Sequence, residues 1–316
     1  MKFTFRHILY GVICCVSLSS CFTGIEGTKK ITLSKSDLKA VEPTAEEKFL
    51  ASVTPSLYTD WIPGKRFFVA DSRASVMLER RGGVAADSLR RGDILLFRES
   101  GTVTAPDGRE MTSLIFEKDS VAYQFAPFDR QPGMAIKSTD IPALIDLDMV
   151  ERVARLMRGR KLWTRSQAWT DSAGRRIPGR KFTEVTVTDV APGSMVFPLA
   201  VDFVDDAGVE ARYMMNFGNS GKESRSFANL FALSDPRHSH GGISDHVWAN
   251  VQRGEVEIGM TKEECRLSKG NPSEVNTGRN YSHALLLWSY PDATVLYFED
   301  DILTGINTYG ADGVRY

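Results

Sequence analysis

The 316-residue chain has few cysteines, and they are unevenly placed. Three of the four lie within the first 21 residues, at Cys14, Cys15 and Cys21, and the fourth is Cys265. A disulfide-stabilised fold needs cysteines spread along its body, and a cysteine-rich metal site needs them paired at short spacing. Both are therefore excluded, and a hydrophobic core must hold the folded part together.

The chain also lacks an excess of either charge, with 39 Lys and Arg against 40 Asp and Glu. Proteins that bind nucleic acids usually carry a basic surplus, so we expect no nucleic-acid partner. The content of 42% hydrophobic and 25% charged residues is ordinary for a globular protein and excludes wholesale disorder. At roughly 150 residues per domain, the length predicts two or three domains.

Beyond residue 21 no apolar run approaches the roughly 20 residues that span a bilayer. At the start, Lys2 and Arg6 precede an almost unbroken apolar run, Ile8–Leu18, with the length of a signal-peptide core. The small residues Ser19-Ser20 then lead directly to Cys21. This order resembles a bacterial lipoprotein signal, which implies cleavage before Cys21 and palmitate-type acyl chains on that residue. The alternative is an ordinary secretory signal that is cut elsewhere.

The resemblance implies a signal peptide at residues 1–20 and a membrane contact through the lipid on Cys21. Residues 21–45 have one aromatic residue, Phe22, and are mostly polar, so we expect the lipidated cysteine to be followed by a flexible tether. Phe22 stands where some bacteria place an acidic inner-membrane retention signal. We therefore expect a cell-envelope protein of the outer membrane, facing the periplasm or the cell surface.

Two tandem β-rich modules, small and barrel-like, are expected at residues 46–135 and 140–237. Short apolar or alternating segments at 66–70, 93–97 and 113–116 indicate strands. The sequence Pro106-Asp107-Gly108 is typical of the turn in a β-hairpin. Apolar residues with helical spacing at 150–157 predict a helix that covers the second module.

The second module repeats the order of the first. Gly159–Trp163 parallels Gly64–Phe68 at an offset of 95, which is the clearest of the matches. Three further matches complete the alignment: Pro192–Phe197 with Arg91–Leu96, Asp206–Gly208 with Pro106–Gly108, and Tyr213–Phe217 with Thr112–Phe116. The pattern favours a duplicated β unit, and the alternative is one larger β-sandwich without duplication.

Neither module carries a recognisable catalytic motif. No Gly-x-Ser-x-Gly elbow is present. Gly218–Lys222 suggests a phosphate-binding loop, but Asn216 and Glu223 replace the required glycine and hydroxyl residue. We therefore expect no enzymatic activity and no cofactor.

Three of the five histidines, His238, His240 and His246, lie within nine residues. An extended His-x-His segment places both rings on one side, and His246 or Asp245 could complete a divalent-metal site there. The alternative is a linker hinged at Gly241-Gly242, after which Ser244 or Asp245 caps a helix.

The last 70 residues predict two helices and three strands. The helices are expected at 245–253 and from Thr261, which forms a capping box with Glu264, to about Lys269. The strands are expected at 283–290, 294–298 and 302–306.

The motif residues of this segment are Gly259, Met260, Thr261, Gly270, Pro272, Trp288 and Tyr290. Their order resembles the SmpA/OmlA (BamE-like) family of outer-membrane lipoproteins, which implies a domain of two helices on a three-stranded antiparallel sheet at residues 244–316. Cys265 and Arg266 depart from the apolar residue usual in that family, and the family's best-known member has no β modules upstream. Because Cys265 is the one cysteine in the body of the chain, we expect it to be a buried thiol.

These features together predict a multidomain α+β protein. We expect a non-catalytic envelope lipoprotein, a scaffold or adaptor that contacts another envelope protein, in outer-membrane assembly or integrity. The alternatives are a periplasmic binding or inhibitory module, and a metal-assisted envelope enzyme that uses the histidine cluster.

Overall fold

The computed structural model describes residues 42–81, 88–127, 129–218, 224–280 and 283–308. The signal peptide, Cys21 and nearly all of the tether lie outside these residues. Residues Pro43–Tyr316 form one compact unit. Helices combine with three antiparallel sheets, so the α+β class is confirmed. No helix of the described part is long and apolar enough to cross a membrane.

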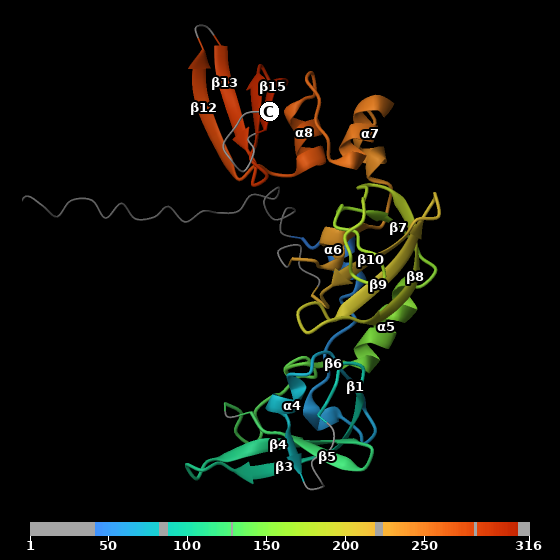
Figure 1. Cartoon of the computed structure of the whole chain (residues 1–316), viewed down its shortest axis with the longest axis vertical. Coiled ribbons are helices and arrows are strands. Elements are labelled where there is room, and N and C mark those ends of the chain that lie inside the picture. The colour runs from blue at the N-terminus through green and yellow to red at the C-terminus, as the bar shows by residue number, and fades with distance from the viewer. Residues whose placement is uncertain (1–41, 82–87, 128, 219–223, 281–282, 309–316) are drawn as a thin grey trace, which may run out of the picture. The chain divides into compact units, whose positions relative to one another are not determined.

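The first sheet has six strands in the order β2-β5-β4-β3-β1-β6. All of them except β2 are labelled in Figure 1. Their bounds are β1 Arg66–Val69, β2 Glu79–Arg81, β3 Ile94–Thr104, β4 Glu110–Lys118, β5 Val121–Phe125 and β6 Leu144–Asp146. Two short helical segments accompany them, η1 (Tyr58–Asp60) and α4 (Ala74–Met77), whereas α3 (Ala45–Phe49) packs against Phe227–Leu230 at the second sheet. Because β6 pairs with β1, this sheet extends past residue 135, where the first module was expected to end.

The second sheet has five strands in the order β10-β9-β8-β7-β11. Their bounds are β7 Lys161–Thr164, β8 Glu184–Pro192, β9 Leu199–Asp205, β10 Glu210–Met215 and β11 Phe231–Ala232. Helix α6 (Phe227–Leu230) leads directly into β11. Apart from the additional edge strand β2, the two sheets share one strand order, which a duplication would produce. That each of these two sheets closes into a small barrel remains a prediction.

Both sheets carry the same irregularity at the same place. The Gly64 N–H donates to the Phe97 carbonyl at 2.8 Å, and the Gly159 N–H donates to the Val187 carbonyl at 2.8 Å. Immediately after Phe97 and after Val187 the register with the next strand shifts by one residue. Both glycines have positive φ, 93° and 73°, a conformation that favours glycine. The match between Gly64–Phe68 and Gly159–Trp163 is therefore confirmed.

The other three aligned pairs were wrong by one strand. The counterpart of β3 is β8, which ends at Pro192, so Pro192–Phe197 covers the end of that strand and the turn after it. The Asp206–Gly208 turn joins β9 to β10, and its counterpart is the turn between β4 and β5. Successive hairpins have similar apolar patterns, so a pattern alignment slips easily by one strand.

Helix α5 (Leu147–Met157) follows β6 without a linker and packs against both β8 and β1 (Figure 1). It confirms the helix predicted at 150–157. The Asp146 carboxylate caps it by accepting from the Asp148 and Met149 N–H groups. Its buried face joins the core of the second sheet with these residues: Met149, Val150, Val153, Ala154 and Met157. Helix α5 thus packs against both sheets.

The C-terminal part contains η2 (Pro236–His240), α7 (Asp245–Arg253) and α8 (Lys262–Lys269), followed by a four-stranded sheet. The strands run in order as β12 Glu274–Asn280, β13 His283–Ser289, β14 Thr294–Glu299 and β15 Ile302–Thr308. Both predicted helices and the Thr261–Glu264 capping box are confirmed. The prediction of three strands was wrong, because β12 was missed. Its sequence, EVNTGRN, has one large apolar residue and no alternation.

Candidate functional site

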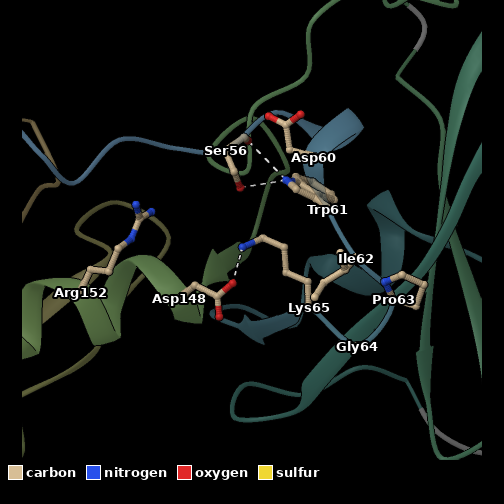
Figure 2. Close-up of a pocket in the computed structure, with 9 residues that line it drawn as sticks. All are labelled: Ser56, Asp60, Trp61, Ile62, Pro63, Gly64, Lys65, Asp148 and Arg152. Carbon is tan, nitrogen blue, oxygen red and sulfur yellow. Dashed lines mark hydrogen bonds and ion pairs between the residues drawn. The ribbon is translucent and has the colours of Figure 1, made fainter.

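A pocket of about 510 Å³ lies between the segment that precedes β1 and the start of α5 (Figure 2). Its lining combines one aromatic, one exposed aliphatic and several charged side chains. The lining residues are Ser56, Asp60, Trp61, Ile62, Pro63, Gly64, Lys65, Asp148 and Arg152.

The buried indole of Trp61 holds one wall in place. Its ring lies 5.0 Å from the ring of Phe67 and 5.2 Å from that of Phe97, between centroids, so it is part of the first sheet's core. Its Nε1 donates to the Ser56 hydroxyl oxygen at 3.0 Å. Because Trp61 is fixed, the next side chain, Ile62, is held in solvent and is 74% exposed.

Lys65 is the charged centre of the pocket floor. Its Nζ lies 2.9 Å from Asp146 Oδ1 and 2.7 Å from Asp148 Oδ2. Lys65 and Asp146 are both buried, whereas the Asp148 side chain is half exposed at the pocket mouth. Two charges removed from water are tolerated only when they are paired, so this contact ties the segment before β1 to the start of α5.

Helix α5 adds a guanidinium one turn further on. Arg152 Nη2 donates to the Thr54 carbonyl at 2.8 Å, and its buried Nε has no hydrogen-bond partner in the described structure. Asp60, next to Trp61 in the lining, is exposed (Figure 2). The pocket therefore presents a donor, two carboxylates and an aliphatic surface to a ligand.

The pocket offers a ligand charged and apolar contacts, and its lining holds few nucleophilic side chains. Its lining residues include no histidine or cysteine, and Ser56 is their one hydroxyl. That hydroxyl oxygen accepts a hydrogen bond from the Trp61 indole. An activated nucleophile instead needs an adjacent base that removes its proton.

The histidine cluster is not assembled into one site. His246 Nε2 lies 2.6 Å from Glu257 Oε2, and His240 Nδ1 lies 3.4 Å from Glu263 Oε1, so each ring faces a different carboxylate. Hydrogen bonds from His246 and Asn250 lower the pKa of Glu257. Among the described residues no three or more His, Cys, Asp and Glu side chains are grouped so as to hold a metal. His238 lies with His240 on η2, and Ser244 caps α7.

The motif residues of the C-terminal segment lie in its core and at the ends of α8. Met260, Trp288 and Tyr290 are buried in its core. Thr261 caps α8, and Gly259 and Gly270 adopt positive φ at the two ends of that helix. Pro272 follows, in the connection to β12.

Cys265 is buried in the same core, and burial together with the Glu264 charge raises the pKa of its thiol to about 12. In a variant with Cys14, Cys15 and Cys21 replaced by serine, we expect no reaction with a disulfide reagent at pH 8, because the thiolate is the reactive form. One thiol per chain should react after unfolding in urea. Rapid reaction of the folded protein would contradict a closed C-terminal core.

The pocket residues were missed by sequence reasoning. Lys65 and Asp146 are 81 residues apart, and no local pattern joins them. One signal was available: Asp146 stands directly before the amphipathic stretch of α5, where a capping aspartate is expected.

No protein-family model matches this chain, and no curated protein matches it.

Proposed function

We propose that this protein is a non-catalytic lipoprotein of the cell envelope, anchored through Cys21, that acts as an adaptor by binding a segment of another envelope protein. The pocket beside α5 carries the proposal. Exposed Ile62 lies next to a floor whose main cation, Lys65, is already neutralised by the chain's own carboxylates. A peptide can bury an aliphatic side chain on Ile62 and place an acceptor at Arg152 without displacing that pair.

The resemblance of residues 244–316 to the SmpA/OmlA family belongs to the same proposal. It is supported by the order of α7, α8 and an antiparallel sheet, and β12 is the departure from the family's three strands. This relationship would assign the adaptor to outer-membrane assembly or integrity.

Photo-crosslinking in intact cells tests the adaptor function. We expect a photoreactive phenylalanine analogue at position 62 to capture an envelope protein. The same probe at Val76 serves as the matched control, because Val76 is 87% exposed on α4 and does not line the pocket. In a chain with the probe at Asp60, adding Ile62→Asp should reduce capture about tenfold, the effect of losing one well-buried contact of about 1.4 kcal/mol. Equal capture at positions 62 and 76, or none above background, would reject the pocket as the contact.

A second candidate is a binding or inhibitory role for the C-terminal sheet. Leu287 and Tyr297 are cross-strand partners, as are Ser289 and Val295, and these rows alternate with the buried row of Trp288 and Leu296. Leu287, Val295 and Tyr297 therefore lie on the face opposite the helices and remain half exposed. Capture from a probe at Leu287, and not at Ile62, would favour this second surface.

A further inference from the structure

A second cavity, of about 320 Å³, contains two lysines and lies between the segment before β8 and the C-terminal end of α8. It is lined by Gln167, Lys181, Gly254, Ser268, Lys269, Tyr290, Pro291 and Asp292. This cavity is separate from the pocket beside α5 and shares no lining residue with it.

The walls of the cavity are fixed to each other by direct contacts. The Lys181 N–H donates to the Gln252 carbonyl at 2.8 Å, and Gln252 Nε2 donates to the Phe182 carbonyl at 3.2 Å. The rings of Phe182 and Trp248 stack with centroids 5.5 Å apart. One backbone hydrogen bond, one side-chain hydrogen bond and one ring stack thus fix the segment that carries Lys181 against α7.

The charges lining the cavity do not balance. Lys269 Nζ pairs with Asp292 Oδ2 at 2.8 Å, which neutralises one of the two ammonium groups. Lys181 Nζ donates to the Ser268 carbonyl at 2.5 Å and has no carboxylate within salt-bridge distance among the described residues. An ammonium group has three hydrogens to donate, so Lys181 keeps donors for a ligand.

The environment of Lys181 disfavours an unpaired ammonium. Burial, followed by the nearby charge of Lys269, lowers the pKa of Lys181. An anion placed between the two lysines would offset both effects, because opposite charges at close range favour the charged form. The cavity also has room beyond a single tetrahedral oxyanion.

We propose that this cavity binds a phosphate group carried on a larger molecule, with Lys181 as the main donor and Lys269 as a second donor through the one N–H left by its contacts with Asp292 and Thr294. The Gln167 amide lies beside them in the lining. Both a phospholipid headgroup and a soluble phosphomonoester present this chemistry. The proposal is independent of the adaptor function, because neither lysine lines the pocket beside α5.

The competing explanation is that Lys181 only caps α8, whose last carbonyls attract a cation. The two explanations differ in what phosphate does. A cap contributes to stability alike in phosphate and in chloride, whereas a binding site makes stability depend on phosphate concentration.

The test measures phosphate binding by the full chain in detergent, through thermal stability and calorimetry at constant ionic strength with chloride as the reference. We expect phosphate to raise the melting temperature and Lys181→Met to weaken phosphate binding about tenfold or more, because charge-assisted hydrogen bonds dominate such sites. Lys161→Met is the matched control, since Lys161 is an exposed lysine paired with Glu184 and should leave binding unchanged.

Two further variants test the phosphate site independently of Lys181→Met. Lys181→Arg should retain phosphate binding, and Lys269→Gln should weaken it even if Lys181→Met fails to fold. Equal effects of phosphate and chloride on the unsubstituted protein, or full phosphate binding by Lys269→Gln and Lys181→Met, would overturn the proposal. Two probes, each tested on the Cys21→Ser chain, distinguish the soluble source from the lipid source. One is inorganic phosphate, and the other is phosphatidylcholine vesicles that contain phosphatidic acid.

Discussion

Replacing Lys65 with methionine is expected to lower the free energy of unfolding by about 3–5 kcal/mol, because it leaves the buried Asp146 carboxylate without its cation. Asp146 Oδ2 already has no hydrogen-bond partner in the described structure, so without Lys65 the carboxylate keeps only the hydrogen bonds that Oδ1 accepts from the Asp148 and Met149 N–H groups. Urea titration followed by tryptophan fluorescence measures the change. Lys161→Met, at an exposed pair with Glu184, should shift stability by no more than about 1 kcal/mol.

A double variant separates the ion pair from simple packing. Lys65→Met with Asp146→Asn removes the buried charge but keeps a side-chain oxygen that can cap α5. We expect the double variant to be more stable than Lys65→Met alone. If the two variants are equally unstable, the loss comes from the lysine's packing and the ion pair is not the cause.

Phe203→Ala is the second change with a large expected effect, about 3–5 kcal/mol of unfolding free energy. The Phe203 ring lies 5.2 Å from Trp169, 4.9 Å from Tyr213 and 6.1 Å from Phe231, between centroids, and is essentially unexposed. Removing it leaves a cavity among aromatic rings that cannot easily close. Differential scanning calorimetry and urea titration measure the loss.

The control for this change is Val196→Ala. Val196 is 65% exposed in the turn between β8 and β9, so the substitution should alter stability by about 0.5 kcal/mol or less. Similar losses in the two variants would contradict the aromatic core as the main support of the second sheet.

Local signals predicted the parts of the fold that depend on neighbours in sequence. The capping box at Thr261 and the apolar spacing of α5 each fix a backbone conformation within a few residues. Strand partners are different. The short strands β6 and β11 join their sheets by pairing with β1 and β7, far away in sequence, and no alternation marks them.

The candidate site could not be predicted for the same reason. The Lys65–Asp146 contact exists only because β6 pairs with β1 and α5 begins at the end of β6. The histidines gave the stronger sequence signal, yet η2 and α7 place His240 and His246 near different carboxylates. Proximity in sequence decided the prediction, whereas sheet pairing decides the structure.

The position of Leu50 and Val53 has a consequence for how the chain folds as it is made. Both residues lie near the start of the folded part but pack in a core that is completed by Phe231, at the end of the second sheet. During synthesis, the side chains of Leu50 and Val53 cannot be fully buried until the chain up to Phe231 has left the ribosome. Such long-range closure is slow and leaves apolar surface open to chaperones or to aggregation. A nascent chain stalled before residue 231 should therefore present a chaperone-binding segment around Leu50 and Val53.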